Sequence, residues 1–113
     1  MFAKNQRITK DKDFNNVFKN GISSYDKVLG VKAVKNNLKI NRFGILVSVK
    51  VSKKAVDRNL LKRQIREILK TISFSDDSCY DVVVIILPSS SEKNFLELKK
   101  SLDYNFKKLK LIK

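Results

Sequence analysis

The chain has 113 residues, including 25 lysines and arginines but only 11 aspartates and glutamates, which gives a formal net charge of +14. This length fits one domain over residues 1–113, since domains most often have about 100–150 residues. The absence of histidine excludes histidine-based triads and histidine-ligated zinc, and the one cysteine, Cys79, excludes an internal disulfide. No apolar run approaches the roughly 20 residues that span a bilayer, so we expect a cytoplasmic protein with no membrane segment.

The positive charge is concentrated in the first two thirds of the chain. Residues 1–70 contain 18 lysines and arginines against five acidic residues, whereas residues 71–113 contain seven against six. An evenly solvated surface would not be this asymmetric. The distribution therefore indicates a basic face that binds a polyanion.

A helix over residues 11–20 is the first predicted element. Thr9 or Asp11 can cap its start, and Gly21 suits the left-handed conformation that often ends a helix. One face of this helix carries the apolar residues of the segment, which are Phe14, Val17 and Phe18.

Two strands are predicted next, near residues 27–34 and over residues 43–51. In the second strand, alternate side chains should point to opposite faces of a sheet. One face would carry Phe43, Ile45, Val47, Val49 and Val51. The other would carry Gly44, Leu46, Ser48 and Lys50.

The second half begins with a helix that starts between Ser52 and Asp57 and ends near Ile72. Residues 80–87 follow as a strand whose unbroken apolar run is typical of a central position, covered on both faces. A closing helix is indicated by a capping box, Ser89 and Glu92, and by an apolar face of Phe95, Leu98, Leu102, Phe106 and Leu109. The predicted order is α-β-β-α-β-α, an α/β (α+β) two-layer sandwich with a small mixed sheet.

The helix near residues 57–72 is the most informative segment. Its projection places an apolar seam of Leu61, Ile65, Ile68, Leu69 and Ile72 beside a cationic flank of Arg58, Asn59, Lys62, Arg63, Arg66 and Lys70. Glu67, the only acid in the helix interior, projects away from that flank. Arg58, Lys62 and Arg66 recur at intervals of four residues, where like charges repel. An ordinary solvated basic face is the alternative, but nucleic-acid phosphate that relieves this repulsion is favoured.

Phe14 and Phe18 of the first helix allow two interpretations. A ten-residue helix needs apolar anchors, so at least one of the two is expected in the core. The other interpretation is that they line a groove where bases stack. The sequence leaves both interpretations open.

Residues 43–59, followed by 62–67, resemble the protein subunit of bacterial ribonuclease P, whose hallmark is a strand ending in Ser-Lys-Lys and a helix with Arg-Asn-Arg-x-x-Lys-Arg-x-x-Arg. Residues 7–21 and 80–109 resemble the first helix and the last two elements of that family. Three positions depart from it. Leu60 replaces the second arginine of the hallmark, Val49 replaces a lysine, and Lys32 stands where members often carry an aromatic residue that faces the substrate groove.

The resemblance implies a left-handed β-α-β crossover, against the general preference for right-handed ones. It also implies a non-catalytic subunit of the ribonuclease P endoribonuclease, in which the RNA subunit removes the 5′ leader of precursor tRNA with Mg²⁺. The protein would bind no metal or cofactor itself and would need no protein partner. The implied contacts with the catalytic RNA are Lys53, Lys54, Arg58, Asn59, Lys62, Arg63 and Arg66. Those with the leader are Arg7, Phe14, Phe18, Lys32, Ser48 and Lys50.

Two other functions are weighed against this one. The first is a stand-alone basic RNA-binding protein of ribosomal-protein type. The second is a metal-dependent nuclease that uses Asp76, Asp77 and Asp81, although a solvated acidic loop is the favoured role for these three residues.

Overall fold

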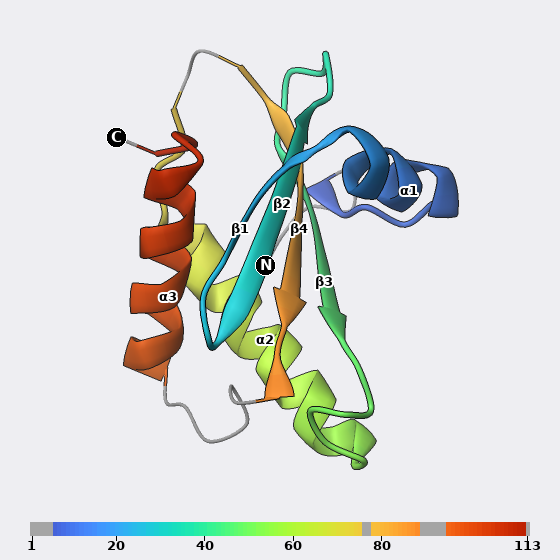
Figure 1. Cartoon of the computed structure of the whole chain (residues 1–113), viewed down its shortest axis with the longest axis vertical. Helices are drawn as coiled ribbons and strands as arrows, with labels where there is room; N and C mark the ends of the chain where they lie inside the picture. Colours follow the sequence, from blue (N-terminus) through green and yellow to red (C-terminus); the bar gives the residue numbers. More distant parts are fainter. Residues whose placement is uncertain (1–5, 76–77, 89–94, 113) are drawn as a thin grey trace.

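The computed structural model describes residues 6–75, 78–88 and 95–112 (Figure 1). Its elements are α1 (Asp11–Asn20), β1 (Ile22–Tyr25), β2 (Leu29–Lys35), β3 (Arg42–Val47), α2 (Ala55–Thr71), β4 (Tyr80–Ile86) and α3 (Phe95–Lys108). The predicted mixed α+β class is confirmed, with three helices and an open four-stranded sheet in the described residues.

The strand order in the sheet is β1-β2-β4-β3. The β1–β2 and β2–β4 pairs are antiparallel, whereas β3 and β4 are parallel and are joined through α2. Figure 1 shows β3 and β4 running in the same direction with α2 behind them, which makes this crossover left-handed. The sheet is therefore mixed and carries the crossover that is rare among β-α-β units.

The strand β4 is the centre of the molecule because helices pack on both faces of it. Val82, Val84 and Ile86 point toward α2 and α3 and belong to the main core. Val83 and Ile85 point the other way, into a smaller apolar cluster with Ile8, Phe14, Val17 and Val34. The unbroken apolar run predicted such a doubly covered strand, and the structure confirms it.

Two features of the strands differ from the sequence prediction. The short edge strand β1 was not predicted, because Ile22–Tyr25 has only four residues and exposes three of them. The strand β3 ends at Val47 rather than at residue 51. The backbone turns there, with the amide of Val51 donating to the carbonyl of Ser48 (3.1 Å), and Val49 is 64% exposed.

The ends of α1 are formed differently from the prediction. Lys10 occupies the N-cap position and no side chain caps the helix, so neither Thr9 nor Asp11 does. Gly21 has an ordinary extended backbone with φ −82° rather than a left-handed one. Glycine is needed there for space, since a Cβ would lie 2.4 Å from the carbonyl oxygen of Val17. The capping box at Ser89 and Glu92 lies outside the described residues.

Among the residues that the structure describes, no helix combines the length and apolar character that a membrane span requires.

Candidate nucleic-acid interface

The helix α2 has the two surfaces that its sequence predicts. Leu61, Ile65, Ile68 and Leu69 are buried against the sheet and α3. Leu60, which the projection places on the outer side, is 49% exposed, whereas the adjacent Leu61 is 7% exposed. The helical register, and with it the position of the cationic flank, is therefore correct.

The first turn of α2 is held to the preceding loop. The guanidinium of Arg58 donates to the carbonyl of Ser52 (2.8 Å), and the hydroxyl of Ser52 donates to Asp57 (3.0 Å). Lys53 and Lys54, which are exposed, lie between these anchored residues. Arg58 thus supports the loop that presents the two lysines, in addition to any contact it makes with an anion.

The middle of the flank borders a cleft between α1 and α2, which we call the α1–α2 cleft. Its volume is about 170 Å³, and it is lined by Arg7, Ile8, Thr9, Phe14, Phe43, Gly44, Ile45, Lys62 and Arg66. Arg7 reaches this position because the segment before α1 runs beside β3, where the amide of Ile8 donates to the carbonyl of Phe43 (2.9 Å). The cleft therefore brings together Arg7 and Phe14, predicted as leader contacts, with Lys62 and Arg66, predicted as contacts of the catalytic RNA.

A second hollow, the cationic pocket, continues along the flank. It has a volume of about 220 Å³ and is lined by Arg7, Arg63, Arg66, Glu67 and Lys70. Glu67 therefore borders the cationic flank, although the helical projection placed this residue away from it. The reason is that the Glu67 carboxylate accepts a hydrogen bond from Lys70 (3.1 Å). That bond lowers the pKa of the Glu67 carboxyl below its usual value. The pocket keeps a net positive charge, since four cations face one carboxylate.

The helix α1 lies across the strands along one row of the sheet. Lys32, Val83 and Gly44 are paired neighbours in that row. Phe14 lies over Gly44 and Phe18 lies beside Lys32, whose ammonium is 5.8 Å from the centre of the Phe18 ring. Because the two aromatic residues are four positions apart on α1, the Phe14 ring lies at β3 and the Phe18 ring lies at β2.

The structure places the two aromatic residues in different environments. Phe14 is half-buried and packs against the small apolar cluster with Ile8 and Val17. Phe18 is 40% exposed, and its ring is available to a ligand. One aromatic residue therefore anchors α1 and the other lies open beside it.

The next row of the sheet exposes an aromatic residue that the sequence prediction missed. Leu46, Ile85 and Gly30 are neighbours in this row, and Tyr25 of β1 pairs with Gly30. The Tyr25 ring covers Gly30 and is 47% exposed. The alternation of side chains along a strand could have revealed it. The hydroxyl of Ser24 donates to the side-chain oxygen of Asn105 (2.6 Å) on the inner face, so the next side chain, Tyr25, points toward the α1 side.

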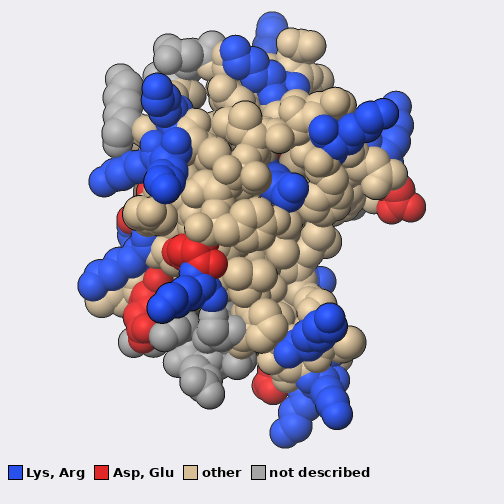
Figure 2. Space-filling model, viewed as in Figure 1, with Lys and Arg blue, Asp and Glu red and all other residues tan. Residues whose placement is uncertain are grey.

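Ser48 and Lys50 are not part of the row beneath α1. Both are exposed in the turn after β3, where the amide of Lys50 donates to the hydroxyl of Ser48 (3.2 Å). The prediction that they share one face of a strand with Gly44 and Leu46 is therefore wrong, because β3 ends before them. Figure 1 shows this turn at the opposite end of the sheet from α1. Figure 2 shows positive side chains over both ends, with a broad and largely uncharged area between them.

Asp81 is not part of a solvated loop. Its side chain is 3% exposed, and its carboxylate accepts hydrogen bonds from Arg42 (2.8 and 2.5 Å) and from Asn36 (3.0 Å). Arg42 also reaches Asp13 of α1 (3.5 Å), and its bonds to Asp81 raise the pKa of the guanidinium. A carboxylate occupied in this way holds α1 and two strands together rather than binding a metal. Asp76 and Asp77 lie outside the described residues.

The cationic flank of α2 meets the α1 side of the sheet at the α1–α2 cleft, and that side also exposes two aromatic residues, Phe18 and Tyr25. Such a combination is typical of a small RNA-binding protein, here of mixed α+β build. The family model for ribonuclease P matches residues 2–110. A ribonuclease P protein component of Alkaliphilus metalliredigens is 33% identical over 108 residues, covering 96% of each chain. The solved ribonuclease P protein of Staphylococcus aureus superposes with a TM-score of 0.84 at 31% identity, over 96% of this chain and 98% of that one. The protein of Thermotoga maritima gives 0.76 at 31% identity, over 95% and 97%.

The chain belongs to the ribonuclease P protein family. It is a protein subunit of the holoenzyme that matures the 5′ end of tRNA, and its partner is the ribonuclease P RNA. The resemblance seen in the sequence is thereby confirmed, as is the assignment to a ribonuclease subunit. The interpretations as a stand-alone binding protein and as a metal-dependent nuclease are not supported.

Proposed function

We propose that the cationic flank of α2 binds the catalytic RNA and that the α1 side of the sheet binds the 5′ leader of precursor tRNA. The observation that carries this proposal is the α1–α2 cleft, in which Arg7, Lys62 and Arg66 converge from two elements around an apolar floor. The lining of this cleft contains three cations and no carboxylate, which suits the phosphates of a nucleic acid. The cleft also joins the two surfaces, so that one protein contacts both RNAs at once.

For the catalytic RNA, the proposed contacts extend from the exposed Lys53 and Lys54 through Asn59, Lys62 and Arg63 to Arg66. Arg58 contributes mainly by holding the loop before α2 through its bond to Ser52. Each lysine or arginine that neutralises a phosphate releases counterions, which makes binding strongly dependent on salt.

For the leader, the proposed path begins at Arg7 and follows the exposed side of the sheet. Phe18 and Tyr25 offer ring faces for bases, and Lys32 between them offers a charge for the backbone. Stacking is tolerant of sequence because every base has a flat face, which suits a leader that differs from one precursor to the next. Ser48 and Lys50 lie in the turn after β3, at the other end of the sheet from α1. They would be contacts only for a leader long enough to extend past Phe18, Lys32 and Tyr25.

The protein supplies binding, and the RNA supplies the chemistry. We propose that Mg²⁺ acts with the catalytic RNA in phosphodiester hydrolysis, and that the protein holds no metal or cofactor and needs no further protein partner. Among the described residues, no group of three or more acidic, cysteine or histidine side chains is placed to hold a metal. A cytoplasmic location and a single domain over residues 1–113 complete the proposal.

Reconstitution tests this division of labour. Purified protein is mixed with Mg²⁺ and a precursor tRNA, with and without a transcript of ribonuclease P RNA, and the released leader is measured. The proposal expects cleavage only when the RNA transcript is present, and faster cleavage at low Mg²⁺ when the protein is added. Cleavage by the protein alone would contradict it, as would an RNA reaction that the protein does not affect.

A further inference from the structure

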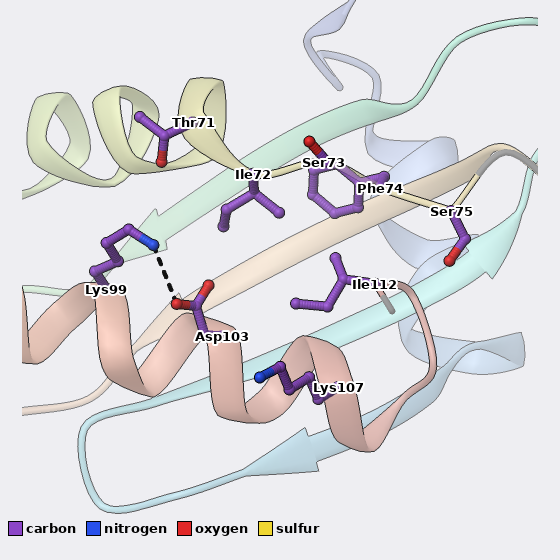
Figure 3. Close-up of a pocket in the computed structure, with 9 residues that line it drawn as sticks. All are labelled: Thr71, Ile72, Ser73, Phe74, Ser75, Lys99, Asp103, Lys107 and Ile112. Atoms are coloured by element: carbon purple, nitrogen blue, oxygen red, sulfur yellow. Dashed lines mark hydrogen bonds and ion pairs between the residues drawn. The ribbon is translucent and has the colours of Figure 1, made fainter.

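A pocket between the end of α2 and α3 lies outside the surfaces described so far (Figure 3). This α3 pocket has a volume of about 450 Å³ and is lined by Thr71, Ile72, Ser73, Phe74, Ser75, Lys99, Asp103, Lys107 and Ile112. Volumes of about 300–1,000 Å³ are typical of sites for small ligands. It is therefore large enough for one nucleotide.

The walls of the α3 pocket are held in place by the core. The Phe74 ring packs between the rings of Phe43 and Phe106, with centroids 5.3 and 5.2 Å away. The amide of Ser75 donates to the carbonyl of Leu111 (2.8 Å), which ties the segment after α2 to the end of the chain. A pocket fixed in this way loses little conformational freedom when it is filled.

The lining combines the groups that a nucleotide requires. Ile72, Phe74 and Ile112 provide an apolar surface for a base. On α3, Lys99 donates to Oδ2 of Asp103 (3.1 Å), and Figure 3 shows this pair facing the segment after α2. Lys107, one turn further along α3, has no ion-pair partner among the described residues. The pair is neutral overall, so Lys107 leaves the pocket with a net positive charge.

The α3 pocket also lies close to the end of the cationic flank. A connecting hollow of about 290 Å³ lies between them and is lined by Gln6, Asn41, Phe43, Leu69, Lys70, Ile72 and Phe74. It shares Lys70 with the cationic pocket, and it shares Ile72 and Phe74 with the α3 pocket. An RNA strand bound along the flank is therefore near enough to reach α3.

We propose that the α3 pocket binds a single unpaired nucleotide of an RNA that is bound along α2, an inference that rests on the proposed function of the flank. Its base lies on Ile72 and Phe74, and its phosphate lies at Lys107. Oδ1 of Asp103, which accepts no hydrogen bond from the described residues, accepts from an amino group of the base. The same chemistry is offered by the catalytic RNA and by the precursor, and the two are distinguished by experiment.

Three variants test the proposal. Lys107→Ala removes the phosphate contact, Ser73→Trp fills the pocket from an exposed position, and Lys100→Ala is the matched control, an exposed lysine of α3 outside the pocket. Affinities for a ribonuclease P RNA transcript and for a precursor tRNA are measured separately over a range of salt, after circular dichroism has shown an intact fold.

We expect Ser73→Trp to weaken binding of one of the two RNAs about fivefold or more, the lower end of what a stacked base contributes. Lys107→Ala should lower the salt slope for the same RNA by about 0.7, the value for one phosphate of a single strand, whereas Lys100→Ala should not. The RNA that is affected identifies the source of the nucleotide. Chemical probing should then find a nucleotide of that RNA that the wild-type protein protects and Lys107→Ala does not.

The proposal is overturned if Lys107→Ala and Ser73→Trp bind both RNAs as Lys100→Ala does. Millimolar AMP or CMP that raises the melting temperature of the free protein, without any change in RNA binding by the variants, also overturns it in favour of a free mononucleotide. Failure of the wild-type protein to bind the ribonuclease P RNA would instead reject the proposed function itself, so the two failures are distinguishable.

Discussion

The Phe14 ring of α1 lies directly over Gly44 of β3. A Cβ at Gly44 would be 2.6 Å from Cε1 and 2.9 Å from Cζ of that ring, closer than such atoms pack. Glycine is therefore required at this position because α1 rests on the strand. This contact sets the distance between α1 and the sheet, and so the shape of the α1–α2 cleft.

Gly44→Ala should lower the free energy of unfolding by about 1–3 kcal/mol, the usual cost of overpacking a buried site. The control is Gly30→Ala, whose Cβ would also meet a ring, that of Tyr25. Because the Tyr25 side chain is half-exposed on the edge strand, it can turn away, and the cost should be clearly smaller. Urea denaturation measures both variants. Equal losses would mean that α1 is not held at Gly44.

Asp81→Ala should destabilise the protein by about 3 kcal/mol or more, since it leaves Arg42 in a mostly buried site with only the longer contact to Asp13. Asp103→Ala removes a half-exposed carboxylate paired with Lys99, and should cost about 1 kcal/mol or less. Thermal or urea unfolding distinguishes the two. If Asp81→Ala cost no more than the control, the ion pair that joins α1 to the strands would not stabilise the fold.

Leu60→Arg restores the residue that the family carries, and it should change the stability by no more than about 0.5 kcal/mol because Leu60 is exposed. Its affinity for the catalytic RNA should rise slightly or stay level. Leu61→Arg, one residue along, should cost about 2–5 kcal/mol or more, the range for losing a buried side chain. A large loss for Leu60→Arg would show that the register of α2 is wrong.

Phe18→Ala should weaken binding of precursor tRNA about fivefold or more, as expected when one stacked base loses its platform, and should leave mature tRNA unaffected. Tyr25→Ala should have the same selectivity, because both rings lie on the exposed side of the sheet. Binding to the reconstituted holoenzyme is measured with both tRNAs. An equal loss for the two tRNAs would place these residues against the shared tRNA body or in the core.

Much of the fold could be predicted because its elements have strong periodic patterns. The three helices and the central strand show clear apolar spacing, and α1 begins and ends at the predicted residues. The edge strand β1 could not be predicted in this way, because an edge strand exposes most of its side chains. The end of β3 was missed because Val49 continues the alternation in sequence while the backbone turns.

The site could be predicted only in part, for a related reason. Helical geometry alone placed Lys62, Arg63 and Arg66 on one flank. It could not show that Arg7 joins them, since that depends on the segment before α1 running beside β3. The burial of Asp81 was equally hidden, because its partner Arg42 is 39 residues away in sequence.

The central claim is that the cationic flank of α2 contacts the ribonuclease P RNA, and the salt dependence of binding tests it most directly. Arg66→Ala and the control Lys100→Ala are compared with wild type by filter binding of the RNA transcript at several salt concentrations. For Arg66→Ala, we predict weaker binding and a salt slope lower by about 0.7–0.9, the loss of one phosphate contact, with no such change in the control. An affinity and a salt slope equal to those of wild type would contradict the assignment of the flank.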